Sequence, residues 1–230
     1  MEDIIHYKHE SEYCDPISIK GTEIIIRQMK KAICKIYTYD ALIGTGFFCR
    51  IPYKKRIIPV LITNNHVIGK DYFYRGKKIE ITIDDDKNSF QLKENYYRKI
   101  YSNELFDVTI IEIMKEDNIS MDDFLEVDED LLSMDEEKLK FYINRSIYEL
   151  HYPEGTIAMV SYGVIKNIDR DNNYNIMHLC KSDKSSSGSP LLDIKSNKVI
   201  GIHIGRRRNM YISVGTFLNF PIMNLLMILI

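Results

Sequence analysis

The sequence lacks the cysteine patterns of a zinc-binding or disulfide-rich protein. Only four cysteines occur in 230 residues, and none of them forms a CxxC pair or lies near a pair of histidines. A metal site and a disulfide framework are therefore not expected. Four scattered cysteines in a chain of this size fit the reduced thiols of a cytosolic protein. The sequence predicts no cofactor.

The chain also lacks an excess of positive charge. Lys and Arg number 31 against 33 Asp and Glu, which gives a net charge of −2. Nucleic-acid-binding domains usually carry a basic face, so no nucleic-acid partner is expected. With 45% hydrophobic and 28% charged residues, the composition is that of an ordinary globular protein with one large or two small domains.

Long hydrophobic runs are absent as well. Residues 1–16 are polar and charged and contain no apolar core of a secretory signal. The most apolar segment, the C-terminal PIMNLLMILI, is too short to span a bilayer. It is expected to form a docked terminal helix with Pro221 near its start. The sequence thus predicts a cytoplasmic protein without a membrane partner, and it gives no indication of the oligomeric state.

What the chain does contain is two series of short apolar segments separated by turn residues. The first includes VLITNNHVI and DVTIIEIM, and the second includes IYELHYP and KVIGIHIG. Short segments at such regular spacing predict β-strands of a sandwich or barrel. For EIIIRQMKKAICKI the periodicity leaves helix and strand open.

The residues between the two series, 116–147, are strongly acidic and are expected to form a linker or insertion with short helical pieces. The expected organisation follows the chain in order. It consists of an N-terminal lead-in (1–20), an N-terminal β unit (21–115), the acidic segment (116–147), and a C-terminal β unit with the terminal helix (148–230).

Three polar residues stand at the edges of predicted strands: His66, Asp107 and Ser187. Each alone is more often a capping or turn residue. Together, in this order and divided between two β units, they indicate nucleophilic catalysis. A serine hydroxyl needs a neighbouring base, a histidine can take and return its proton near neutral pH, and an aspartate can orient that histidine.

The sequence around these residues resembles the signature blocks of the chymotrypsin-fold (trypsin-like) serine peptidases. The blocks are TNNHVI at His66, FDVTII at Asp107 and SSSGSP at Ser187. GTGFF (44–48) and LHYPEG (150–155) resemble two further family segments, with His151 where glycine is usual. SGSP followed by VIGIH resembles the glutamyl endopeptidase branch. The resemblance covers roughly residues 22–228.

This resemblance implies a fold and a set of roles. The fold is all-β, with two antiparallel six-stranded β-barrels, the active site in the cleft between them and a short C-terminal helix. Ser187 is the nucleophile, His66 the general acid and base, and Asp107 the residue that orients His66. The backbone N–H groups of Ser185 and Ser187 form the oxyanion hole. Ser185 stands where the family usually has glycine, and holding it at positive φ costs about 1–3 kcal/mol.

The resemblance also implies which residues line the pocket for the substrate residue before the scissile bond, P1. These are Lys181, His203, Ile204 and Gly205. The family's histidine at the position of His203 contacts acidic P1 side chains, and Lys181 with the arginine run 206–208 adds positive charge. The expected substrate is a protein or peptide cleaved after Glu or Asp, with Gln as second choice.

Two alternatives stay open beside an intracellular serine endopeptidase. One is a catalytically silent, protease-like binding module. The other is a protease of the HtrA type, because TNNHVI resembles that branch too. Those proteins carry a PDZ domain after the barrel, and too few residues follow Ser187 to build one. The HtrA alternative therefore ranks low.

Overall fold

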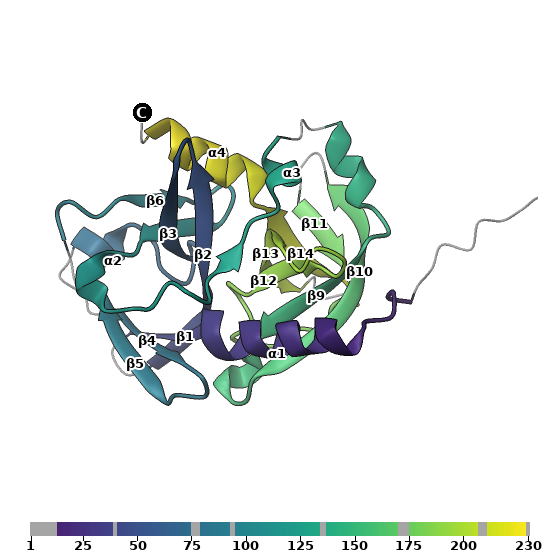
Figure 1. Cartoon of the computed structure of the whole chain (residues 1–230), viewed down its shortest axis with the longest axis horizontal. Coiled ribbons are helices and arrows are strands. Elements are labelled where there is room, and N and C mark those ends of the chain that lie inside the picture. Colours follow the sequence, from purple (N-terminus) through teal and green to yellow (C-terminus); the bar gives the residue numbers. More distant parts are fainter. Residues whose placement is uncertain are drawn as a thin grey trace, which may run out of the picture.

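The structure, a computed structural model, describes residues 13–38, 41–74, 79–92, 95–133, 137–169, 175–206 and 211–228. Two β units lie side by side, with the longest helix along one face and the C-terminal helix on the opposite one (Figure 1). The elements of the N-terminal unit are α1 (Ile19–Ala32), β1 (Ile33–Thr38), β2 (Ala41–Tyr53), β3 (Arg56–Thr63), α2 (Asp71–Tyr74), β4 (Ile79–Ile83), β5 (Asn88–Leu92), β6 (Ile100–Asn103) and β7 (Val108–Glu112).

The second half of the chain supplies the other elements. The segment between the units contains β8 (Leu125–Glu126), α3 (Glu129–Leu132) and the 3₁₀ turns Lys115–Asp117 and Lys138–Tyr142. The C-terminal unit contains β9 (Ser146–His151), the 3₁₀ turn Pro153–Gly155, β10 (Met159–Asp169), β11 (Asn175–His178), β12 (Pro190–Asp193), β13 (Val199–Arg206), β14 (Ser213–Phe217) and α4 (Asn219–Ile228).

The C-terminal unit is a closed barrel of six antiparallel strands in the order β10-β11-β14-β13-β12-β9. Its interior is lined by aliphatic and aromatic side chains such as Ile147, Leu191 and Phe217, all fully buried. Gly163 permits a close approach, because a Cβ there would lie 2.3 Å from the backbone nitrogen of Cys180. For this unit, the expectation of a six-stranded barrel is confirmed.

The N-terminal unit differs from the expected six-stranded barrel. It is an eight-stranded sheet in which β5-β4-β1-β2-β3-β7-β6 follow one another and β8 pairs with β2. Within the described residues the sheet does not close, so the expectation of two closed barrels is wrong, and the β2–β8 pair is parallel. The edge strands β5 and β6 have only five and four residues, and most of β5 is exposed.

The ambiguous segment before the first strand is a helix. α1 begins after Ser18, whose side chain accepts a hydrogen bond from the Gly21 N–H at 3.1 Å. Ile25, Met29 and Ala32 recur at helical spacing and are buried. The helix therefore lies across the expected boundary between lead-in and first β unit, and β1 follows it directly.

The acidic segment contacts both units. Its Phe124 stacks on Phe48 of β2 with ring centroids 4.9 Å apart, and β8 then pairs with β2. A few residues later, Asp128 donates its backbone N–H to the carbonyl of Val199 in β13 at 2.9 Å. The expected short helical pieces are present as α3 and two 3₁₀ turns.

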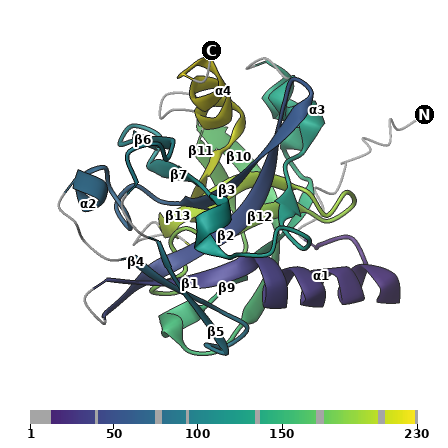
Figure 2. The same cartoon turned by 60° about the vertical axis from the view of Figure 1, so that its left-hand side comes forward.

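Each terminal helix forms hydrogen bonds with the unit that is remote from it in sequence, and α1 also contacts β1, β2 and β4 of its own unit (Figures 1 and 2). Gln28 of α1 donates to the carbonyl of Asn197 at 2.9 Å and accepts from the Tyr148 hydroxyl at 2.7 Å. Asn224 of α4 donates to the Tyr101 hydroxyl at 3.3 Å. The predicted terminal helix with Pro221 in its first turn is thus confirmed as α4, and it docks across the molecule. None of the helices in the described ranges has the length and apolar character needed to cross a membrane.

Candidate active site

Strand pairing places His66 beside Asp107. His66 follows β3, Asp107 precedes β7, and these strands pair antiparallel next to both residues, at Thr63 and Thr109. His66 Nδ1 lies 2.6 Å from Asp107 Oδ2, and the His66 backbone N–H donates to Asp107 Oδ1 at 2.9 Å. An ionised carboxylate only accepts hydrogen bonds, so Nδ1 carries the proton. Nε2 then presents its lone pair, which is the arrangement of a base.

The backbone around Asp107 fixes its carboxylate. Asp107 has a φ of 51°, a left-handed conformation that aspartate tolerates better than most residues. Its N–H donates to the carbonyl of Glu104 at 3.2 Å, and its carbonyl accepts from the Asn64 side chain at 2.9 Å. The Asp107 side chain is 19% exposed, against 49% for His66. The aspartate is thus shielded while the histidine faces the solvent.

Ser187 lies in the turn before β12, where the two β units meet. Its carbonyl accepts from the Thr45 N–H of β2 at 2.9 Å, and its hydroxyl donates to the carbonyl of Ile204 at 2.9 Å. The register of β13 against β14 shifts between His203 and Gly205, which frees that Ile204 carbonyl from the ladder. Among the described residues, no hydrogen bond joins the Ser187 hydroxyl to His66.

The backbone of the same turn has the conformation that the sequence predicts. Ser185 has a φ of 65°, and its carbonyl accepts from the Thr45 hydroxyl at 2.8 Å. Gly188 has a φ of 92° and packs against the carbonyl of Thr45. Within the described part of the chain, the N–H groups of Ser185 and Ser187 have no acceptor.

The residues expected at the P1 pocket surround this turn from β13 and from the segment after β11. His203 is 1% exposed, and a Cβ on Gly205 would meet no atom within 4 Å. Lys181 is exposed, and its carbonyl accepts from the Ser161 hydroxyl at 2.6 Å. Of the arginine run, Arg206 is exposed at the end of β13. Arg207 and Arg208 lie outside the described residues.

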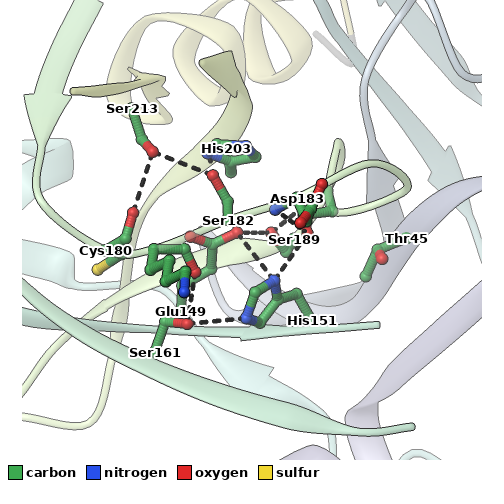
Figure 3. A network of polar contacts seen from close by, with 12 residues as sticks. Thr45, Glu149, His151, Ser161, Cys180, Ser182, Asp183, Ser189, His203 and Ser213 are labelled. Carbon is green, nitrogen blue, oxygen red and sulfur yellow. Dashed lines mark hydrogen bonds and ion pairs between the residues drawn. The ribbon is translucent and has the colours of Figure 1, made fainter. Parts of the chain in front are cut away.

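Beneath the turn lies a buried polar network that the sequence analysis missed (Figure 3). Glu149 and His151 of β9 are buried, and the Ser189 hydroxyl lies within hydrogen-bond distance of Glu149 Oε1, at 2.6 Å. Burial raises the pKa of Glu149 to about 8 and lowers the pKa of His151 to about 4. The signal in the sequence was the pair of titratable residues inside the apolar segment IYELHYP.

Two further histidines extend the network. His203 Nδ1 lies 3.3 Å from His178 Nε2 and 3.9 Å from Glu149 Oε1. Burial lowers the pKa of His178 to about 3 and holds the pKa of His203 well below its usual range. Burial thus keeps both imidazoles neutral.

In the described residues, Glu149, His178 and His203 are the only group of three side chains placed so that they could bind a metal ion. Donor atoms of Glu149, His178 and His203 lie within 4.8 Å of one another, and a carboxylate with two imidazoles is a donor set that zinc accepts. Here the two histidines pair with each other and Ser189 contacts Glu149 Oε1, while Glu149 Oε2 and His178 Nδ1 have no hydrogen-bond partner among the described residues. Sequence patterns do not predict this cluster, because its members come from three different strands, β9, β11 and β13.

Comparison with known proteins agrees with this geometry. The family model described as the trypsin-like peptidase domain matches residues 44–202. The chain therefore belongs to the trypsin-like peptidase family, and its fold is that of a serine protease. No curated protein matches the chain in sequence.

Solved structures of the same fold are similar at low sequence identity. The serine endoprotease from Yersinia pestis matches with a TM-score of 0.64 and 14% identity, covering 93% of this chain and 68% of that one. The inactive form of Rv3671c from M. tuberculosis matches with a TM-score of 0.62 and 14% identity, covering 94% and 96%.

The HtrA-type protease AlgW with a tripeptide matches with a TM-score of 0.61 and 16% identity, covering 88% of this chain and 61% of AlgW. These similarities support the chymotrypsin-like fold. They do not single out the glutamyl endopeptidase branch.

Proposed function

We propose that the chain is a serine endopeptidase that cleaves peptide bonds through an acyl-enzyme intermediate. The observation that carries the proposal is the His66–Asp107 pair, with its two hydrogen bonds to one carboxylate. The Ser187 carbonyl accepts from the Thr45 N–H, so the serine turn lies against the sheet that carries His66 and Asp107. Catalysis of this type requires a nucleophile and a base that are held by a rigid scaffold.

In the proposed reaction, the Ser187 hydroxyl leaves the Ile204 carbonyl and attacks the substrate carbonyl carbon. His66 Nε2 accepts the proton as the new C–O bond forms, and Asp107 stabilises the resulting imidazolium. His66 then donates this proton to the leaving amine as the C–N bond breaks. A water molecule, deprotonated by His66, hydrolyses the ester and restores Ser187.

The oxyanion of each tetrahedral intermediate is proposed to lie between the N–H groups of Ser185 and Ser187. Both donors lack acceptors in the described structure, and the Ser185 carbonyl is held by the Thr45 hydroxyl. A preorganised donor of this kind contributes about 10²–10³ in kcat in a known case. The strained φ of Ser185 is consistent with a functional constraint on this peptide group.

Labelling with a fluorophosphonate, which reacts with activated serines, tests the proposed nucleophile. Wild type is expected to be labelled and Ser187→Ala to be unlabelled, with both variants folded by circular dichroism. A folded wild type that stays unlabelled would instead favour the catalytically silent binding module. The hydrogen bond from Ser187 to Ile204, rather than to His66, is the observation behind that alternative.

We further propose that the enzyme prefers Glu or Asp at P1, with Gln next. The support is the placement of His203 beside the serine turn, with exposed Lys181 and Arg206 on the flanking segments. Peptides that differ only in Glu, Gln or Lys at P1 test this preference. A higher kcat/KM for the Lys peptide than for the Glu peptide would refute it.

A further inference from the structure

His151, which occupies a position where the family usually has glycine, contacts the nucleophile turn directly (Figure 3). It is the last residue of β9 and is 1% exposed. Its Nδ1 lies 2.7 Å from the hydroxyl of Ser186, and its Nε2 lies 2.9 Å from the hydroxyl of Ser161. Ser186 is the residue between the two proposed oxyanion donors.

The hydrogen bonds of the two serines fix the protonation of His151. The Ser161 hydroxyl donates to the carbonyl of Lys181 at 2.6 Å, so it has no proton left for His151 and must accept from Nε2–H. A neutral imidazole protonated on Nε2 is an acceptor at Nδ1, and Ser186 is then the donor to it. The chain of donors runs in one direction from Ser186 through His151 and Ser161 to Lys181.

Ser186 is held from several sides, so its conformation is defined. Its hydroxyl accepts from the Asp183 N–H at 3.2 Å, and its own N–H donates to the Asp183 carbonyl at 3.2 Å. Its carbonyl accepts from the Ser189 N–H at 3.1 Å and from the Ser189 hydroxyl at 2.7 Å. The peptide groups on either side of Ser186 include the N–H of Ser187, so a rotation of Ser186 would turn that donor.

We infer that His151 is a positioning residue, which holds the oxyanion donors of the nucleophile turn in place through Ser186 and does so as the neutral Nε2–H tautomer. This role rests on the proposed serine peptidase function. His151 touches no reacting atom; it acts by keeping the Ser186 hydroxyl engaged below the turn. Thr45 holds the same turn from the N-terminal sheet through Ser185.

The groups around His151 favour its neutral form. Glu149 Oε1 lies 3.7 Å from Nδ1 on the same strand, but Glu149 itself is held protonated by burial. Burial lowers the pKa of His151 by more than the negative charge of Asp183 raises it. His178 and His203, from β11 and β13, are neutral neighbours whose own pKa values are lowered by burial. Protonated His151 could not accept the Ser186 hydroxyl.

The enzymatic test compares His151→Leu, which removes both contacts, with His151→Asn, whose amide oxygen can replace Nδ1 as an acceptor. Ser186→Ala removes the other partner. The Leu and Ala variants are expected to lose about 10²-fold in kcat and in fluorophosphonate labelling rate, with KM within about twofold, because an oxyanion donor is misplaced. The Asn variant is expected to recover at least tenfold of that loss. Urea unfolding checks that each variant is folded.

The outcomes separate the two proposals. A folded wild type that is never labelled would refute the serine peptidase function itself. A labelled wild type with an equal kcat in folded His151→Leu would overturn the positioning role alone, as would an Asn variant no better than Leu.

A second measurement needs no variant to be active. In ¹⁵N-histidine NMR spectra at pH 7, His151 is expected to be neutral and protonated on Nε2. The resonance is assigned by its loss in a His151 variant. Protonation on Nδ1, or on both nitrogens, would overturn the inference.

Discussion

Replacing Glu149 by glutamine should change how the stability of the protein depends on pH. The pKa of Glu149 is raised from 4.5 to about 8 by burial. Ser189 supports a protonated carboxyl, because its single hydroxyl proton faces two acceptors, Glu149 Oε1 at 2.6 Å and the Ser186 carbonyl at 2.7 Å. If Glu149 donates to Ser189, then Ser189 donates to Ser186, and each of these two contacts holds one proton, while Glu149 Oε2 has no hydrogen-bond partner among the described residues.

The sign of the effect follows from proton linkage. Between pH 4.5 and 8 the folded protein holds the Glu149 proton and the unfolded chain has lost it, so the free energy of unfolding falls as pH rises. The slope from this residue is about 1.4 kcal/mol per pH unit, and the sum is about 5 kcal/mol by pH 8. At pH 7 the loss is about 3 kcal/mol, a large fraction of the 5–15 kcal/mol stability of a typical domain.

The Glu149→Gln variant carries an amide that cannot ionise, so it lacks this slope. Urea unfolding followed by circular dichroism at pH 5, 6, 7 and 8 gives the free energy of unfolding of both proteins. The difference, variant minus wild type, should rise by about 1.4 kcal/mol per pH unit and level off above pH 8. Subtraction cancels the titration of all other groups, and a constant packing change only offsets the curve. A difference that is flat or falls with pH would refute a protonated Glu149.

Three further predictions concern other parts of the structure. Gly188→Ala should lower the free energy of unfolding by several kcal/mol and abolish fluorophosphonate labelling. A Cβ there would lie 2.0 Å from the Thr45 carbonyl, and the φ of Gly188 is 92°. Gly205→Ala is the matched control, because its Cβ would meet no atom within 4 Å, and its free energy of unfolding should fall by less than about 0.5 kcal/mol. Arg98→Met should lose about 3–5 kcal/mol in urea unfolding, because it leaves buried Asp117 without its bidentate partner. Lys87→Met, which breaks an exposed pair with Asp84, should lose no more than about 1 kcal/mol, and equal losses would contradict the role of burial. The free energy of unfolding of the Glu149→Gln variant should decrease as the pH is lowered below 6.5, because His151 and His178 stay neutral in the folded protein and gain protons in the unfolded chain. Urea midpoints that do not change between pH 7 and 4.5 would count against this.

The sequence predicted the residues that local patterns determine. The blocks around His66, Asp107 and Ser187 predicted their placement at strand edges, and pairing of β3 with β7 brings the first two into contact. The positive φ of Ser185 was expected from the missing glycine. The glutamyl endopeptidase branch, the P1 preference and the catalytic roles stay predictions.

What the sequence did not predict depends on contacts between distant segments. Closure of a barrel depends on pairing between strands that are distant in sequence, and no ladder joins β5 to β6 in the described structure. The segment that forms α1 was ambiguous because its apolar residues fit both the spacing of a helix and that of a strand. In the structure it is a helix that begins after the capping residue Ser18. Glu149 and His151 were overlooked because all six residues of β9 are buried, so no alternation marks which face each side chain occupies.

The crossed packing of the terminal helices has a consequence for any change made at the ends of the chain. α4 follows the last strand of the barrel, yet it binds Tyr101 in the sheet that carries His66 and Asp107. α1 precedes that sheet, yet it binds Asn197 in the barrel that carries Ser187. Trimming or tethering either helix is therefore expected to disturb the β unit that is remote from it in sequence, and separating the two units into fragments would break these contacts.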